Sequence, residues 1–170
     1  IIAEGPARLL ARDDDFIGIE KARAKLAAFI GADADEVAFT TQFSTAVNIV
    51  VEGLAWQPGD EVIVTDQEHP ASLIPLMNVV RRHDLKVSRI PVSHNADEML
   101  ASFQAVLTDR TKLVAVSHVT TDSGTRLPAA EMTRLAQERG SYVLFDGAHA
   151  VGQFPVDMHA LGCDFYAMVG

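Results

Sequence analysis

The sequence predicts an α/β fold, a three-layer α/β/α domain built on a mostly parallel sheet. Segments with strand character alternate with segments of helical spacing along the whole chain. Several predicted strands are apolar without alternation, Lys112–Ser117 most clearly, which is typical of a parallel sheet covered on both faces. No internal repeat or low-complexity linker divides the chain, so we expect residues 1–170 to form one domain.

The helices are predicted from apolar spacing and from the residues that end them. Residues 16–30 carry apolar side chains at helical spacing, and Gly31 follows as a stop. Asp13 to Asp15 supply capping acceptors and negative charge near the start of this helix. Further helices are expected at 46–54, from Pro70 through Val80, at 96–107, and from Pro128 to near Gly140.

Short apolar runs between turns predict the strands. They lie at 37–40, 61–65, 86–90, 112–117, 142–145 and 164–168. Both ends of the sequence look cut, because the first residues enter a helix-like pattern without a lead-in and the last form a strand without its loop. We therefore expect a fragment of a longer protein.

Composition limits the classes of function. The 170 residues are 48% hydrophobic and 22% charged, which suits a globular domain with a sizeable core. A net charge of −9 argues against nucleic acid as the main partner, since nucleic acid favours a basic face. No apolar run is long enough to cross a bilayer, so no membrane association is expected. The single cysteine excludes an internal disulfide and fits the reducing cytosol, so we expect a cytoplasmic protein.

The stretch Val143–Gly152 is the strongest candidate for a functional site. Its strand delivers Asp146 at the carboxyl end, and His149 follows three positions later. Ligands of open α/β sheets bind just outside the carboxyl ends of the strands. On this stretch alone, a ligand-facing carboxylate and an aspartate that caps an Asp-Gly turn are equally good interpretations.

Three other strand ends carry polar residues that could converge with Asp146. Ser44 and Thr45 open a helix whose free N–H groups suit a phosphate, although an ordinary N-cap is commoner at such a junction. His69 is either an acid–base group or a loop histidine beside a helix-opening proline, and His118 lies close to Thr121. A convergent set of this kind predicts a cofactor pocket. The glycine motifs of dinucleotide and P-loop sites are missing, which disfavours those ligands.

Three motifs stand out in the sequence: 143–157 with its continuation 161–166, Asp66–Pro70, and Ser117–Gly124. In their order and spacing they resemble the class V aminotransferase group of fold-type I pyridoxal-phosphate enzymes, the cysteine desulfurase-like branch in particular. The resemblance covers essentially all 170 residues. It implies the large domain of these enzymes, pyridoxal 5'-phosphate as cofactor, an amino-acid substrate and a homodimer. The reaction implied most closely is that of a cysteine desulfurase or carbon–sulfur lyase, with a class V aminotransferase or an amino-acid epimerase as the alternative.

The resemblance also implies roles around the cofactor ring. Asp146 would pair with the protonated pyridine nitrogen and keep the ring an effective electron sink. His69 would stack on the ring face and assist proton transfer, which makes it the candidate catalytic residue. His149 would lie near the phenolic oxygen, and Thr121 stands where the family has an asparagine that contacts the same oxygen.

The phosphate would be held at the helix that follows the first strand. Ser44, with the backbone of Phe43 and Thr45, occupies the matching positions. Phe43 stands where a small or hydroxyl residue is usual, and Val169 replaces a serine. Each of these departures removes or changes a polar contact of the family's site.

The resemblance places the Schiff-base lysine just after Gly170, and the substrate-carboxylate arginine and any catalytic cysteine further on. The lysines of the sequence read as solvated charges away from the pocket, at positions 21, 25, 86 and 112. Cys163 belongs to a packing motif and is expected to be structural.

Two alternatives of other classes remain open. A metal-dependent hydrolase would use His69, His118, His149 and Asp146 as ligands, but only Asp146 and His149 are close in sequence, so no metal is expected. A non-catalytic assembly domain would keep the fold without the lysine.

Overall fold

The computed structural model describes residues 15–169, and these fall into two compact units that divide after Phe39. Among the described residues, no helix is long and apolar enough to cross a membrane.

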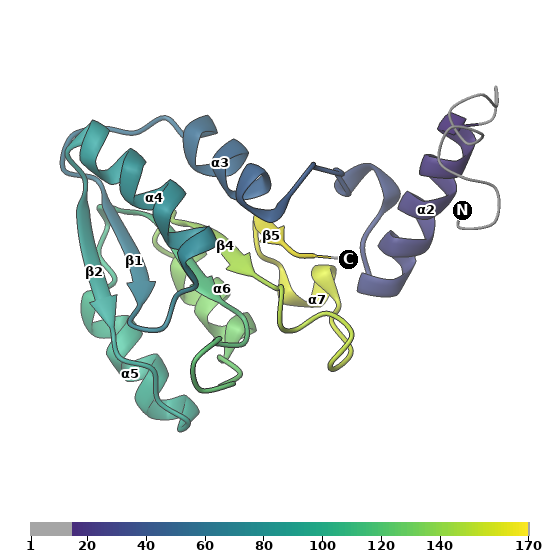
Figure 1. The fold of residues 1–170 in the computed structure, drawn as a ribbon. Coiled ribbons are helices and arrows are strands. Elements are labelled where there is room, and N and C mark those ends of the chain that lie inside the picture. Colours follow the sequence, from purple (N-terminus) through teal and green to yellow (C-terminus); the bar gives the residue numbers. More distant parts are fainter. Residues whose placement is uncertain (1–14, 170) are drawn as a thin grey trace. The chain divides into compact units, whose positions relative to one another are not determined.

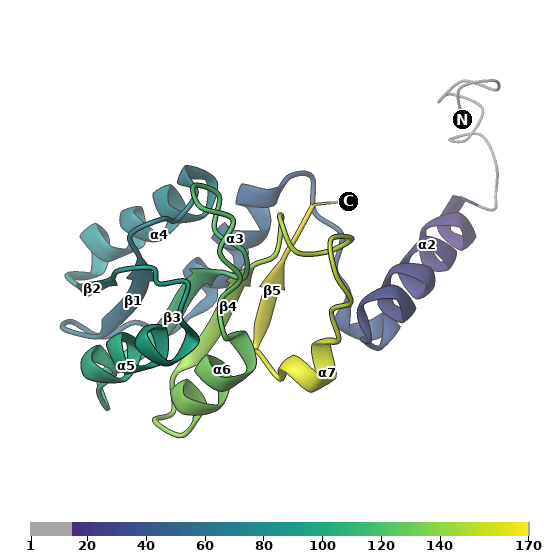
Figure 2. The ribbon, with the colours of Figure 1, turned by 90° about the horizontal axis from the view of Figure 1, so that it is seen from below.

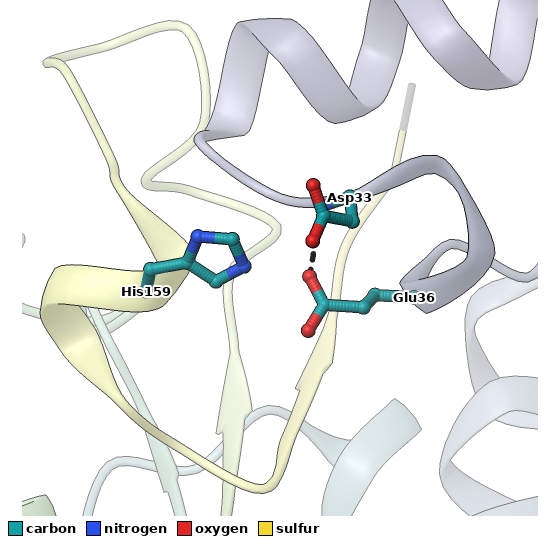
Figure 3. A group of neighbouring side chains, drawn as sticks. All are labelled: Asp33, Glu36 and His159. Carbon is teal, nitrogen blue, oxygen red and sulfur yellow. Dashed lines mark hydrogen bonds between the residues drawn. The ribbon is translucent and has the colours of Figure 1, made fainter.

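The first unit contains the helix α2 (Asp15–Ile30) and the short 3-10 helix η1 (Ala34–Glu36). Helix α2 matches the predicted helix, and Gly31 ends it with a φ of 64°, which glycine adopts without strain. Asp13 and Asp14 lie outside the described residues. The side chain of Glu36 accepts a hydrogen bond from the N–H of Asp33 at 2.8 Å and so caps η1. Figure 3 draws these two side chains together with His159 of the second unit.

The predicted strand Val37–Thr40 is wrong, because the segment has no strand partner among the described residues. The N–H of Val37 donates to the carbonyl of Ala34, and the carbonyl of Val37 accepts from the Arg23 guanidinium. Phe39 is half exposed, and the Cζ of the Arg23 guanidinium lies over its ring, 5.2 Å from the ring centre of Phe39. The apolar run is therefore used for local contacts with α2 instead of a sheet.

The second unit is built on five parallel strands in the order β2-β1-β3-β4-β5. The strands are β1 (Glu61–Thr65), β2 (Lys86–Ile90), β3 (Thr111–Ser117), β4 (Tyr142–Asp146) and β5 (Phe165–Ala167). The three central strands are almost entirely buried, as their unbroken apolar runs require. The predicted mostly parallel α/β architecture is confirmed.

Helices cover both faces of this sheet. Figures 1 and 2 show two helices on one face, α3 (Phe43–Gly53) and α4 (Pro70–His83). Three lie on the other, α5 (Ala96–Val106), α6 (Ala129–Gln137) and α7 (Met158–Leu161). Each face has its own apolar cluster, centred on Val47, Val51 and Leu76 on the first side and on Phe103, Met132 and Phe145 on the second.

Candidate active site

Asp146 is the last residue of β4, and its carboxylate is buried at the carboxyl end of the sheet. The side chain is only 8% exposed. Its Oδ2 accepts a hydrogen bond from the Ser72 hydroxyl at 3.0 Å, and its Oδ1 accepts from the N–H of Ala148 at 3.0 Å. Within residues 15–169, no cationic side chain forms an ion pair with it. Burying a carboxylate without a cationic partner costs free energy. A ligand with a positive charge would remove this cost, so the geometry fits a cationic ligand.

His69 is the N-cap of α4, directly before Pro70 at the first helical position. Its Nδ1 accepts a hydrogen bond from the N–H of Ala71 at 3.1 Å. The neutral ring therefore carries its proton on Nε2. Since the residue is exposed, the ring face and the Nε2–H are open to a ligand. Ser72, one turn into the same helix, is the residue that reaches Asp146.

The predicted phosphate turn forms the first turn of α3, which begins earlier than the expected 46–54. Gln42 is the N-cap, and its carbonyl accepts from the N–H groups of Thr45 and Ala46. The N–H groups of Phe43 and Ser44 come before Thr45, whose N–H is the first donor of the helix, and so have no partner in the helix. The Phe43 side chain packs against the apolar cluster on the α3 side of the sheet, which accounts for an aromatic residue here.

A narrow cavity lies between α3 and Asp146. Val47, one turn inside α3, lines this cavity together with Glu68, Ser72 and Asp146. Helix α3 and the buried carboxylate of Asp146 therefore line the same cavity, whose walls are mostly apolar.

Thr121 and His149 lie in exposed turns that follow β3 and β4. The turn of Thr121 is closed by the N–H of Gly124, which donates to the carbonyl of Thr120 at 3.0 Å. The turn that contains His149 is closed by the N–H of Ala150, which donates to the carbonyl of Gly147. In the described part of the chain, neither side chain makes a hydrogen bond, and both are available to a ligand.

His118 does not join the site, contrary to the expected convergence of all four strand ends. It is only 3% exposed, and its Nδ1 lies 2.9 Å from the hydroxyl of Tyr166. Its ring contacts Phe145, Phe154 and Tyr166. Burial, with a smaller contribution from the positive charge of Arg126, lowers the pKa of His118 to about 4. The ring is thus a neutral core group.

The set His69, His118, His149 and Asp146 does not form a metal-ligand cluster among the described residues. With His118 turned into the core, the histidine set of the hydrolase alternative is incomplete. Cys163 packs half-buried against the second apolar cluster, and burial raises the pKa of its thiol to about 12, with the charge of Asp164 adding to the rise. It is a packing residue, as predicted.

The lysines of the second unit lie away from Asp146. The Nζ of Lys86 at the start of β2 is 3.9 Å from the Glu61 carboxylate. Lys112 near the start of β3 lies over the Tyr142 ring, at 5.6 Å. Both are at the amino ends of their strands, whereas Asp146 lies at the carboxyl end of β4.

Sequence reasoning missed four residues of the site, namely Thr65, Glu68, Ser72 and Ser117. The Glu68 carboxylate accepts from the hydroxyl of Thr65 at 2.5 Å and from that of Ser117 at 2.7 Å. Burial raises the pKa of Glu68, the hydroxyls and the Thr65 N–H oppose the rise, and the negative charge of Asp146 adds to it. A signal was present in the sequence, since Thr65 and Ser117 are polar residues that end apolar strands.

Comparison with known proteins agrees with this geometry. Residues 14–170 match the Aminotransferase class-V family. A cysteine desulfurase from Dickeya dadantii (strain 3937) is 38% identical over 156 residues, which cover 89% of this chain and 38% of that protein. A probable cysteine desulfurase from Vibrio cholerae serotype O1 is 36% identical over 155 residues, again covering 89% and 38%.

Solved structures show the same fold. A mutant of C-DES with glycine covalently linked to its PLP cofactor superposes with a TM-score of 0.82 at 31% identity, covering 89% of this chain and 41% of that one. The apo cysteine desulfurase from Thermococcus onnurineus NA1 gives 0.77 at 28% identity, covering 88% and 38%. The chain thus spans about two fifths of the length of these relatives. With the family matched along nearly its whole length and the strand-end carboxylate in place, this chain belongs to the class V aminotransferase family.

Proposed function

We propose that this chain is the cofactor-binding large domain of a pyridoxal-phosphate-dependent enzyme that acts on an amino acid, with cysteine as the first candidate substrate. The observation that carries the proposal is the buried carboxylate of Asp146, which has no cationic partner in the described part of the chain. The relatives named as cysteine desulfurases support the choice of cysteine.

The residues of the site fit the cofactor. A protonated pyridine nitrogen would supply the positive charge that the Asp146 carboxylate lacks. A phosphate would take the free N–H groups of Phe43 and Ser44, the Ser44 hydroxyl and the positive end of the α3 dipole. Thr45 contributes less through its backbone than expected, because its N–H already donates to Gln42 at 3.1 Å.

When bound, pyridoxal phosphate supplies an electron sink for the electron pair released at the α-carbon of the substrate. The chain's own part is to hold the ring and control protons around it. Asp146 keeps the ring nitrogen protonated, because burial strengthens its attraction for a cation. His69 would stack on the ring and, because its Nδ1 accepts from the N–H of Ala71, would present a proton at Nε2. His149 and Thr121 would contact the phenolic oxygen from their exposed turns.

The test is binding followed by product analysis. Wild-type protein, expressed with whatever sequence follows residue 170 in its gene, should bind pyridoxal phosphate and develop its visible absorbance band. D146N should weaken binding by about tenfold or more, because a neutral amide cannot balance the ring's charge. With cysteine, sulfide plus alanine indicates a desulfurase, whereas sulfide plus pyruvate and ammonia indicates a lyase. Stoichiometric zinc without a chromophore would instead favour the hydrolase.

Assembly and location belong to the same proposal. A homodimer in the cytoplasm is supported by the family resemblance and by the single cysteine. Light scattering coupled to gel filtration would measure the mass of the particle, and a monomer at micromolar concentration would count against the dimer.

A further inference from the structure

The order of the strands creates a crevice between β1 and β3. The chain leaves β1 through α4 to reach β2 on one side, and returns through α5 to place β3 on the other side of β1. This reversal is a topological switch point, where α/β sheets bind ligands. Pairing between β1 and β3 ends at Ile63 and Val114. The pairing of β1 with β2 and of β3 with β4 continues to Thr65 and Ser117, the last residues of β1 and β3.

Glu68 bridges this crevice. Its Oε1 accepts two hydrogen bonds from Thr65, from the hydroxyl at 2.5 Å and from the N–H at 3.2 Å. Its Oε2 accepts one from the Ser117 hydroxyl at 2.7 Å. One carboxyl group thus joins the final residues of two strands that no longer pair through their backbones. These three donors occupy most of the acceptor sites of the carboxylate, which has about four lone pairs.

Glu68 is also connected to His69 and to Asp146, two groups of the candidate site. Glu68 immediately precedes His69, and Ser72 connects that turn to Asp146. Ser117 is the strand partner of Asp146 in the parallel register. A displacement of Glu68 would therefore move His69 relative to Asp146. The negative charge of Asp146 acts on Glu68, and no cationic side chain of residues 15–169 forms an ion pair with the Glu68 carboxyl group.

We propose that Glu68 is a positioning residue, a bracket that holds the carboxyl ends of β1 and β3 together and fixes His69 over the site. The bracket itself follows from the hydrogen bonds, whereas its role toward the cofactor rests on the proposed function. It contributes geometry, and it acts on the cofactor through His69 and Asp146.

The first test measures the bracket without any cofactor. In E68A, the amide of Thr65 loses its acceptor, so its hydrogen exchange in the purified full chain should accelerate by about tenfold or more. In E68Q, the amide oxygen still accepts from Thr65 and the Ser117 hydroxyl can turn to accept from the new NH₂ group, so exchange should stay within about threefold of wild type. E131A is the matched control, because Glu131 is exposed on α6.

The second test measures positioning. With pyridoxal phosphate bound, E68A should raise the dissociation constant about tenfold and lose most of the circular dichroism in the cofactor band, because the ring is no longer held in one orientation. E68Q should restore both, and E131A should match wild type. A residue that only stabilised the fold would lower the melting temperature and leave the dichroism per bound cofactor unchanged.

Unchanged exchange at Thr65 in E68A overturns the bracket, whether or not any cofactor binds. Faster exchange with unchanged affinity and dichroism overturns the positioning role. If wild-type protein binds no pyridoxal phosphate, the proposed function fails and the positioning role with it, while the exchange result still decides the bracket. Should E68A fail to fold, S117A removes one donor and leaves Glu68 in place. It should accelerate exchange at Thr65 about threefold and weaken the dichroism, and no change in either would contradict the proposal.

Discussion

Asp146 and His118 are neighbours in the sheet, yet their surroundings are opposite. The N–H of His118 donates to the carbonyl of Asp146 at 2.8 Å, so the two backbones are tied together. The Asp146 carboxylate meets a hydroxyl and an amide at the rim of the sheet. The His118 ring lies among aromatic side chains in the interior. Both residues follow apolar strands in the sequence, so the pattern could not separate the ligand-facing group from the buried one.

The burial of His118 predicts a loss of stability in acid. The folded protein has a His118 pKa of about 4, against about 6.5 in the unfolded chain. Near pH 7 neither state binds the proton, so the folded state bears no penalty there. As the pH falls from 6.5 to 4, only the unfolded chain takes up the proton, and stability drops by about 3 kcal/mol. H118Q cannot titrate in this range, so its free energy of unfolding should fall less over the same interval.

Urea unfolding at pH 7 and pH 4, followed by the fluorescence of Trp56, gives this difference directly. Trp56 is the only tryptophan, and it is buried in the same unit. H149Q serves as the control, since it removes an exposed histidine and keeps His118. Equal losses in wild type and H118Q would show that His118 is not the group responsible.

At the scale of elements, all five strands of the sheet were predicted to within one residue at each end. The bounds of β1 and β2 agree with the sequence prediction, and those of β3 and β4 differ by one residue. The apolar runs of β1, β3 and β4 have few alternative structures, because only a doubly covered strand buries nearly every side chain. The run Val37–Thr40 failed because its length and composition fit a strand equally well, and only the missing partner excluded it. Partners are set by tertiary structure, which a local pattern does not contain.

The same limit explains why the candidate site was predicted only in part. Asp146 and His69 were found because each follows a strand or opens a helix in a recognisable motif. Glu68 and Ser72 were missed because their importance comes from contacts 49 and 74 residues away along the chain. No spacing rule connects residues so far apart.

The contact between the end of β4 and β5 leads to a prediction about Gly147. A Cβ at this position would lie 1.9 Å from Cε1 of Tyr166, and the N–H of Gly147 donates to the carbonyl of Ala167 at 2.7 Å. G147A must therefore displace the Tyr166 ring and break its hydrogen bond to His118. We expect a loss of about 2 kcal/mol or more in the free energy of unfolding.

The matched substitution is G53A at the end of α3, where an added Cβ meets no atom within 4 Å. It should leave stability unchanged or raise it by up to about 1 kcal/mol, because alanine favours the helix. Both variants are compared by urea unfolding at pH 7. If G147A were as stable as G53A, the close approach of Gly147 and Tyr166 would be disproved.

At the scale of the whole molecule, the two compact units contribute unequally to the core. Both apolar clusters of the sheet consist of residues from Phe43 onward. Among the described residues of the first unit, only Ala27 and Ile30 are buried apolar side chains. The stability of the sheet therefore comes from the second unit, and the candidate site with it, since Asp146, His69 and the start of α3 all belong to residues 40–170.

A variant that begins at Thr40 should therefore fold. Because it keeps every residue of both apolar clusters, its urea midpoint should lie close to that of the full chain, and Trp56 should keep the emission of a buried indole. The Trp56 Nε1–H donates to the carbonyl of Val51 at 2.7 Å, a contact that lies wholly within α3 and the loop after it. A chain of the same length that lacks residues 132–170 instead loses α7, β4, β5 and Asp146, and should not unfold cooperatively. Red-shifted Trp56 emission in the variant that begins at Thr40 would show that α2 and η1 are needed to complete the fold, and the division of the molecule into two compact units would then not correspond to independent stability.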